Sequence, residues 1–262
     1  MLWKRKKEKI ARFGIFTKGF VYCMIGALTL TAAISTGGKT TGSGGVLSTI
    51  AGQPFGQILL GITAIGLLGY IFWKFYQAFA DPEGKGNDLK GLFTRAGYAS
   101  SGIFYGFMAF TAVKILFHAG GGSGEGNKSF VVSLLSKPYG QILVGIFAAA
   151  FLSKAGYQLY IAYSGIFKNR VQAAELDNRV ERIIISSGYV GYTARGIVVG
   201  IISYLIFHAA FTANSNSAGG TKDAFNFIQS EFGTIFLAIL AVGLFAYGFF
   251  MLVKARYRTI NI

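Results

Sequence analysis

One charged residue lies near the middle of a long apolar segment. Lys154 is about ten residues from the nearer polar end of the segment 139–163, which corresponds to roughly 15 Å along a helix. A lysine at the centre of a bilayer costs about 2.5–3.5 kcal/mol to insert, and ionisable residues at such depth are by default candidates for function. Lys154 is therefore the first candidate for a polar site.

Two tyrosines occupy the positions that correspond to Lys154 in a threefold internal repeat. If the repeats surround a common axis, Tyr70, Lys154 and Tyr247 form one polar layer, in which the ammonium can lie over a tyrosine ring. The favoured interpretation is simpler: the Lys154 side chain extends towards the nearer headgroups, beside Tyr157 and Gln158. The interior layer is the alternative.

A second group of polar residues is expected near the other end of the helices. Lys114 and His118 are one helical turn apart, and His208 aligns with Lys114 in the next repeat. Two histidines without a nearby acid or thiol do not complete a metal site. A haem between the two histidines is a weaker alternative to ordinary polar helix ends, so we expect no metal and no cofactor.

The apolar segments contain no set of residues that suits catalysis. There is no nucleophile next to a base and no pair of carboxylates, and the Gly-rich stretch 120–126 lacks the strand and the GK[ST] sequence of a phosphate loop. We therefore expect a protein that is not an enzyme.

Small residues recur at fixed spacing in three copies of one unit, which consists of an apolar helix, a Gly-rich loop and a second apolar helix. At four-residue spacing, small residues allow helix backbones to approach closely in a membrane. We therefore expect helix contacts at these positions. The three copies contain Gly14, Gly19 and Cys23, then Gly97, Gly102 and Gly106, then Gly191, Gly196 and Gly200.

Composition places the chain in a membrane. Of its 262 residues, 53% are hydrophobic and 13% charged, and the mean hydropathy is +0.51. Six apolar blocks each have about the 20 residues that span a bilayer core. The predicted fold is a single all-α membrane domain of six transmembrane helices, arranged with pseudo-threefold symmetry about an axis normal to the membrane. The blocks are 13–34, 56–80, 95–118, 139–163, 189–213 and 232–254.

The repeats, linkers and short amphipathic segments complete the expected organisation. The repeats cover residues 10–81, 92–165 and 186–258. Apolar residues near 47–51, 131–135 and 224–228 are spaced as in a helix, which indicates short interfacial helices in the outer loops. Ordinary apolar loops that pack on the bundle are the alternative.

The net charge of +15 is concentrated on one side of the predicted topology. Basic residues gather at the N-terminus (4–18, with the cytoplasmic segment 1–12), at the two linkers (85–95 and 168–182, with linker bounds 81–94 and 165–185) and near the C-terminus (254–258). This distribution predicts that both termini are cytoplasmic, and it favours contact with anionic lipids. No basic–aromatic motif accompanies the charge, so we expect no nucleic-acid partner.

The repeated motifs resemble those of a bacterial membrane family known as domain-of-unknown-function family 1206. The motifs are an arginine near the entry of the first helix (Arg12, Arg95), a Pro-Phe/Tyr-Gly turn (Pro54, Pro138) and a closing Gly-Leu-x-Gly/Ala-Tyr segment, over residues 10–258. The resemblance implies three tandem two-helix repeats in the cytoplasmic membrane, and it supplies no catalytic or ligand residues. Tyr189 and Glu231 depart from the pattern, which marks the third repeat as the expected divergent copy.

Two functional hypotheses follow. The favoured one is a non-catalytic scaffold or accessory protein that binds lipid, a membrane-protein partner or a second copy of itself. The alternative is a transporter or channel for a small solute, with a pathway at the repeat axis and Lys154 in its lining. Whether the axis is packed or hollow distinguishes the two.

Overall fold

The computed structural model describes residues 2–34, 42–52, 56–117, 126–168, 178–214 and 219–257, and these contain helices and no strands. Eight labelled helices lie within these ranges. They are α1 (Leu2–Ile34), α2 (Ser43–Ala51), α3 (Gly56–Phe79), α4 (Leu89–Leu116), α5 (Gly126–Leu135), α6 (Gly140–Ser164), α8 (Asn178–Thr212) and α9 (Thr221–Tyr257).

Six of these helices, within the described residues, are long and apolar enough to cross a membrane. They are α1, α3, α4, α6, α8 and α9. The shortest spans have 24 residues, or about 36 Å at 1.5 Å per residue, against a hydrocarbon core of about 30 Å. The chain is therefore a multi-pass helical membrane protein, as the sequence predicted.

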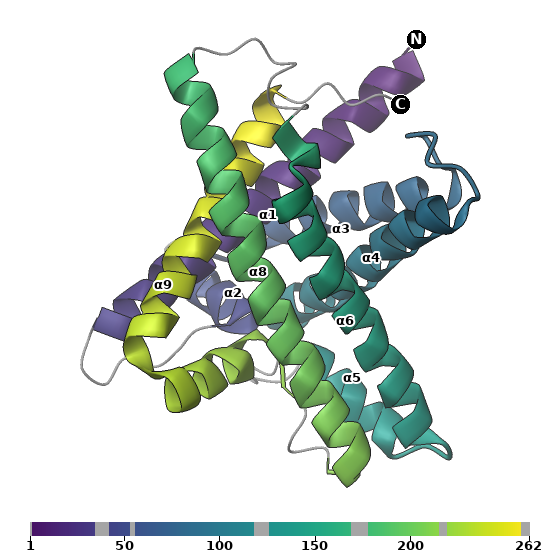
Figure 1. Cartoon of the computed structure of the whole chain (residues 1–262), viewed down its shortest axis with the longest axis vertical. Coiled ribbons are helices and arrows are strands. Elements are labelled where there is room, and N and C mark those ends of the chain that lie inside the picture. The colour runs from purple at the N-terminus through teal and green to yellow at the C-terminus, as the bar shows by residue number, and fades with distance from the viewer. Residues whose placement is uncertain are drawn as a thin grey trace.

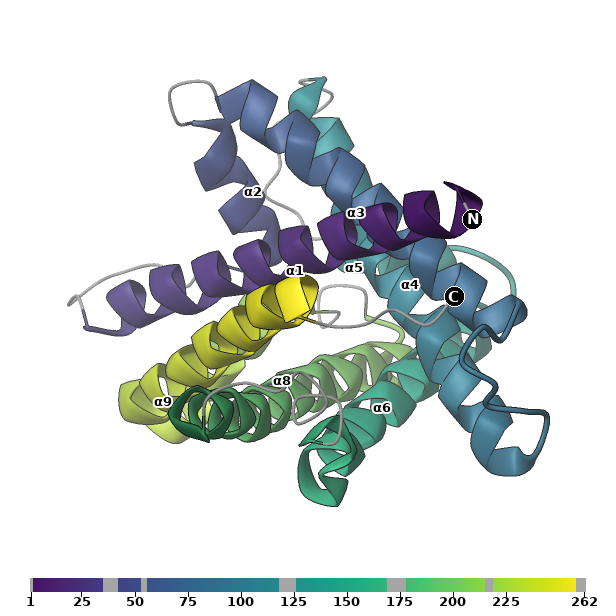
Figure 2. The same ribbon diagram turned by 90° about the horizontal axis from the view of Figure 1, so that it is seen from above.

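The six long helices form a closed ring. Each one contacts the next in chain order, from α1 through α3, α4, α6 and α8 to α9, and α9 returns to pack along α1. Figures 1 and 2 both show α9 beside α1 and α6 beside α8. Three tandem two-helix units thus surround a common interior.

Glycines allow the helices of the first and third repeats to touch at equivalent points. A Cβ added to Gly14 would lie 2.6 Å from the backbone nitrogen of Tyr70, and one added to Gly191 would lie 2.5 Å from the Cα of Tyr247. Between repeats, Gly26 packs equally closely on the backbone of Phe245. At such distances no side chain fits without moving a helix.

The small residues expected at helix contacts differ in what they touch. Gly19 and Cys23 on α1 lie against Gly248 of α9, and Gly102 and Gly196 face side chains of neighbouring helices, while Gly200 makes an ordinary contact with Ala155. The expectation is wrong for Gly106, because a Cβ added there would have nothing within 4 Å. At the level of Gly106, α3 and α4 are therefore not in close contact.

The entry arginines act on the ends of neighbouring helices. Arg12 donates hydrogen bonds to the carbonyl oxygens of Ala255 and Arg256 at the end of α9. Arg95 donates likewise to those of Ala78 and Phe79 at the end of α3. Terminal carbonyls lack partners within their own helix, so each arginine joins one repeat to the previous one in the ring.

Three helices begin earlier than the apolar pattern indicated: α4 begins at Leu89, six residues before the predicted block 95–118, and the other two extend further. The transmembrane segment was predicted from residue 13, yet α1 begins at Leu2; the fifth was predicted from residue 189, yet α8 begins at Asn178. In both cases a polar, proline-free stretch continues the helix beyond the apolar block, and apolar periodicity does not detect such an extension.

The short outer helices are present. They are α2, α5 and the first part of α9, which is separated from the rest of α9 by a kink at Gly233, where φ is 82°. In Figure 1, α2 and α5 lie away from the marked chain ends, while the start of α1, the ends of α6 and α9, and the α3–α4 linker lie towards them. We call the latter the linker end and the former the loop end.

Candidate functional site

A cavity of about 140 Å³ lies inside the ring and reaches towards the linker end. Its walls come from all six long helices and from the segments that follow α3 and α6. The lining residues are Ile15, Lys18, Tyr70, Trp73, Lys74, Gln77, Glu83, Tyr98, Ser101, Lys154, Tyr157, Gln158, Ile161, Ile166, Phe167, Ile184, Tyr192, Arg195, Tyr247, Phe250, Met251, Val253 and Lys254.

Lys154 lies in this cavity and does not extend to the membrane surface. Its side chain is buried, with 2% of the residue exposed, and its Nζ lies 4.0 Å from the ring centroid of Phe104 and 5.5 Å from that of Tyr105. The favoured sequence interpretation, a side chain extended to the headgroups, is therefore wrong. The opposite face of α6 is exposed on the outside of the ring, so the face that carries Lys154 points to the interior.

Tyr70 and Tyr247 are also buried in the cavity wall, but a different lysine lies between them. Lys18 donates a hydrogen bond to the Tyr70 hydroxyl over 3.0 Å, and its Nζ lies 4.9 to 5.1 Å from the ring centroids of Tyr70, Tyr105 and Tyr247. Three aromatic faces around an ammonium form a favourable cation–π environment. The cation that lies between Tyr70 and Tyr247 is therefore Lys18 and not Lys154.

Arg195 on α8 is held rigidly by uncharged groups. Its guanidinium donates to the hydroxyls of Tyr22, Tyr105 and Tyr247 and to Oε1 of Gln158, over 2.8 to 3.0 Å. These partners come from four other helices, so Arg195 ties the ring together at this level. All of them are neutral, so none balances the guanidinium charge.

Three buried side-chain atoms in the described part of the chain have no hydrogen-bond partner: Trp73 Nε1, Lys154 Nζ and Gln158 Nε2. All three residues line the cavity. Each atom is a donor, and buried polar groups are costly when left unpaired. The cavity thus offers an unsatisfied set of donors to any group that carries several acceptor atoms.

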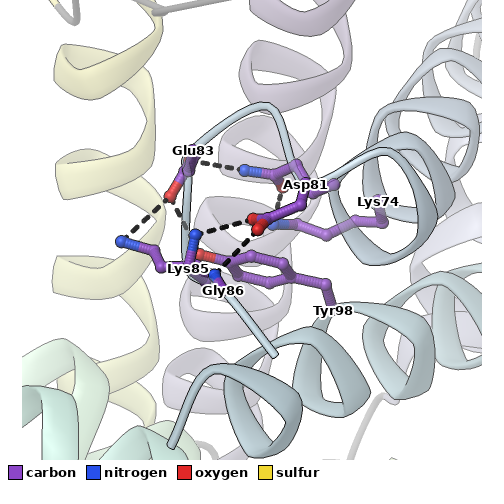
Figure 3. Close-up of polar contacts among 7 residues, drawn as sticks. Lys74, Asp81, Glu83, Lys85, Gly86 and Tyr98 are labelled. Atoms are coloured by element: carbon purple, nitrogen blue, oxygen red, sulfur yellow. Dashed lines mark hydrogen bonds and ion pairs between the residues drawn. The ribbon is translucent and has the colours of Figure 1, made fainter. Parts of the chain in front are cut away.

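Glu83 lies at the mouth of the cavity, on the linker between α3 and α4 (Figure 3). Its carboxylate accepts hydrogen bonds from Gln77 Nε2 over 2.6 Å and from the Tyr98 hydroxyl over 3.0 Å, and it pairs with Lys85 over 3.6 Å. Gln77 in turn accepts from Lys74 Nζ over 2.5 Å. A carboxylate is thereby fixed where the cationic cavity opens.

Asp81 shapes the turn that carries Glu83. Its carboxylate accepts the backbone N–H groups of Lys85 and Gly86, both over 2.8 Å (Figure 3). These two hydrogen bonds hold the pKa of Asp81 below its ordinary value of 3.8. Asp81 and Gly84 both have positive φ, at 43° and 61°, which makes the turn tight.

The second predicted group of polar residues does not join the cavity. Lys114 and His208 are exposed, and they lie against single rings, Phe110 and Tyr204 respectively. His118 lies outside the described residues. In the described ranges no cluster of three or more His, Cys, Asp or Glu residues could hold a metal ion.

Sequence reasoning missed Lys18 and Arg195, although the repeat contained the signal. Lys18 lies four residues after Gly14, and Arg195 lies four residues after Gly191, as Ser101 does after Gly97. The three are therefore repeat-equivalent and all line the cavity. Lys18 was grouped with the basic N-terminal residues, and this grouping concealed a charge inside an apolar span.

Fold and site together define a class: a multi-pass helical membrane protein of three two-helix repeats, with a cationic cavity inside the ring. The chain belongs to the family described as Domain of Unknown Function (DUF1206), whose sequence model matches residues 13–81, 96–165 and 190–258. The resemblance inferred from the repeated motifs is thus confirmed. The uncharacterized protein YxxB of Bacillus subtilis (strain 168) is 31% identical over 252 residues, which cover 96% of this chain and 91% of that relative. No solved structure matches the chain.

Proposed function

We propose that this protein is a non-catalytic transporter of the bacterial cytoplasmic membrane that binds a small anion-bearing solute in the cavity inside the ring. The observation that carries the proposal is the set of unpaired donors on Trp73, Lys154 and Gln158, three residues that all line one cavity. A carboxylate, phosphate or sulfate group has enough acceptor oxygens to satisfy all three at once.

Charge and size support an anionic solute. Among the described lining residues, Lys18, Lys74, Lys154, Arg195 and Lys254 are cationic, and Glu83 is the one carboxylate. A cavity of one sign of charge with low-dielectric walls concentrates ions of the opposite sign. Its volume of about 140 Å³ is roughly tenfold what one water molecule needs, so it fits a group of several atoms.

The cavity favours the transporter hypothesis over the scaffold hypothesis. A scaffold that only packs against a partner gains nothing from buried cations, each of which costs several kcal/mol of desolvation. Repeats related by an axis along the membrane normal also occur in transporters, with the substrate site near the midplane. With the basic linker end on the cytoplasmic side, the cavity faces the cytoplasm.

The protein contains a reporter for this proposal, because Trp73 lines the cavity and Trp3 is the other tryptophan. In Trp3→Phe protein reconstituted in phosphatidylcholine nanodiscs, acetate, sulfate and phosphate are titrated while Trp73 fluorescence is recorded. We expect a saturable change with at least one anion, and its loss in Lys154→Met. Electrical currents on solid-supported proteoliposomes then test movement. Binding without current would leave an anion-binding protein that does not transport, and no binding would overturn the proposal.

A further inference from the structure

The cavity lining combines two kinds of side chain. Cations line it, among them Lys18, Lys154 and Arg195, and so do apolar side chains, among them Ile161, Ile166 and Ile184. A small hydrophilic anion would pair with the cations alone. The apolar part of the lining would remain uncovered, and apolar surface is stabilised by an apolar occupant.

The loosest seam of the ring lies between α4 and α6, where the contacts include a hydrogen bond from Ser100 to the carbonyl oxygen of Ala150 and the rings of Phe104 and Phe151. In the first and third repeats the paired helices touch, because Gly14 and Gly191 pack on the backbones of Tyr70 and Tyr247. The equivalent glycine in the second repeat, Gly97, is not in contact with backbone: a Cβ there would meet only the ring of Tyr157, at 3.6 Å. The close contact between paired helices is thus missing at the equivalent glycine of the second repeat.

The cavity reaches this seam. Tyr98 and Ser101 on α4 line it, and so do Tyr157 and Ile161 on α6. The residues equivalent to Tyr157 in the other repeats are Trp73 and Phe250, both 2% exposed, whereas Tyr157 is only half-buried. Both seam helices are membrane-spanning, so the outer side of the seam faces the hydrocarbon region.

We infer that the ligand is an amphiphilic anion: a charged head bound at Lys154, near the charges of Lys18 and Arg195, joined to a hydrocarbon chain that leaves through the α4–α6 seam. This inference rests on the proposed anion-binding function and names the class of its ligand. The head satisfies the unpaired donors, and the chain covers apolar side chains of the lining. Free alkyl phosphates or carboxylates and membrane phospholipids share this chemistry.

Two phosphate probes with the same head test the role of the chain. Ethyl phosphate and octyl phosphate are titrated into the Trp3→Phe protein in phosphatidylcholine nanodiscs, with Trp73 fluorescence as the signal. Octyl phosphate is expected to bind at least about tenfold more tightly, because each buried methylene contributes roughly fourfold to affinity. Equal affinities would overturn the inference and leave the anion-binding function intact. No binding of either probe would overturn both.

Two glycine substitutions distinguish passage of the octyl chain through the seam from general effects of octyl phosphate on the bilayer. Gly97→Leu fills the space between α4 and the Tyr157 ring, whereas Gly156→Leu adds the same side chain where a Cβ has nothing within 4 Å. We expect Gly97→Leu to lose the octyl advantage and to keep its affinity for ethyl phosphate, which also shows that it is folded. Gly156→Leu should match the parent. An octyl advantage that persists in Gly97→Leu would exclude the seam as the path of the chain.

Brominated lipids distinguish the two sources of the ligand. Bromine on an acyl chain quenches a tryptophan only at short range, and Trp73 is 2% exposed. If a phospholipid is the ligand, brominated phosphatidylglycerol will quench Trp73 more than brominated phosphatidylcholine does, and Gly97→Leu will remove the difference. Equal quenching by the two lipids, with octyl phosphate still bound, assigns the site to a free amphiphile.

Discussion

Lys154 and Arg195 are both buried cations of the cavity wall, but their surroundings give them different roles. Arg195 donates to four neutral side chains from four other helices, so its position is fixed by the ring. The Lys154 ammonium has no hydrogen-bond partner among the described residues. The first is part of the framework, and the second is available to a ligand.

Replacement of Lys154 by methionine should therefore leave the fold intact and remove anion binding. Methionine keeps the length and apolar bulk of the side chain while it removes an unpaired buried charge, so unfolding free energy should stay equal or rise by about 1–4 kcal/mol. Thermal unfolding with and without phosphate measures both effects. Phosphate should raise the Tm of the parent and not that of Lys154→Met. A Tm several degrees below that of the parent would contradict this assignment.

Replacement of Arg195 by methionine should have the opposite effect on stability. It leaves three buried tyrosine hydroxyls and a glutamine oxygen without their donor, so we expect a loss of about 2–4 kcal/mol. Arg195→Lys keeps the charge but cannot reach four acceptors with one ammonium. Its stability should therefore lie between that of the parent and that of Arg195→Met. If Arg195→Met unfolds at the parental temperature, the guanidinium does not hold the ring together.

The residue-scale features differ in how far sequence could predict them. The repeat placed Tyr70, Lys154 and Tyr247 at one level, and all three line the cavity. The partners of each side chain depend on which helices adjoin across the ring. Lys18 on α1 lies over the ring of Tyr247 on α9, a contact between the two ends of the chain that no local pattern contains.

At the scale of helices, close approach of backbones should dominate stability. Gly26→Leu puts a side chain where a Cβ would lie 2.5 Å from the backbone of Phe245, and forced separation of α1 from α9 should cost about 1–3 kcal/mol or more. Gly61→Leu is the matched control, because a Cβ there has nothing within 4 Å and leucine favours helix. Thermal unfolding in detergent compares them, and equal Tm values would contradict close α1–α9 packing.

The α3–α4 linker makes a separate prediction, because Glu83 is an anion at the mouth of an anion site. Glu83→Gln keeps the shape of the side chain and removes a like charge, so phosphate should bind roughly threefold to tenfold more tightly. Trp73 fluorescence in the Trp3→Phe background measures the affinity. Weaker binding in Glu83→Gln would mean that Glu83 supports the ligand and does not compete with it.

The sequence predicts the helices themselves better than it predicts the distances between neighbouring helices. Apolar blocks, repeated glycines and turn residues predict the six long helices and the short outer ones. The width of the α4–α6 seam depends on the ring of Tyr157, which lies against Gly97 where the other repeats bring backbone to glycine. A tyrosine in an apolar segment suits a packed contact or an open one equally well, so the sequence does not distinguish them.

At the scale of the whole molecule, three similar units produce a ring whose interior is not symmetric. Equivalent positions hold Lys18, Ser101 and Arg195 on the first helices of the repeats. The repeat fixes where polar side chains meet, and the differences between copies decide the chemistry. Of these three, the small hydroxyl of Ser101 lies on α4, which borders the α4–α6 seam.

The orientation of this ring decides which compartment supplies the ligand. The start of α1, the end of α9 and the α3–α4 linker lie towards the linker end (Figure 1), and the basic residues predict that this end is cytoplasmic. In a Cys23→Ala background, a cysteine at Ser43 on α2 should therefore react with a membrane-impermeant maleimide in intact cells. A cysteine at Lys85, next to the cavity mouth, should react only after the membrane is permeabilised. The opposite labelling pattern would show that the topology is reversed. The cavity would then take its anion from outside the cell.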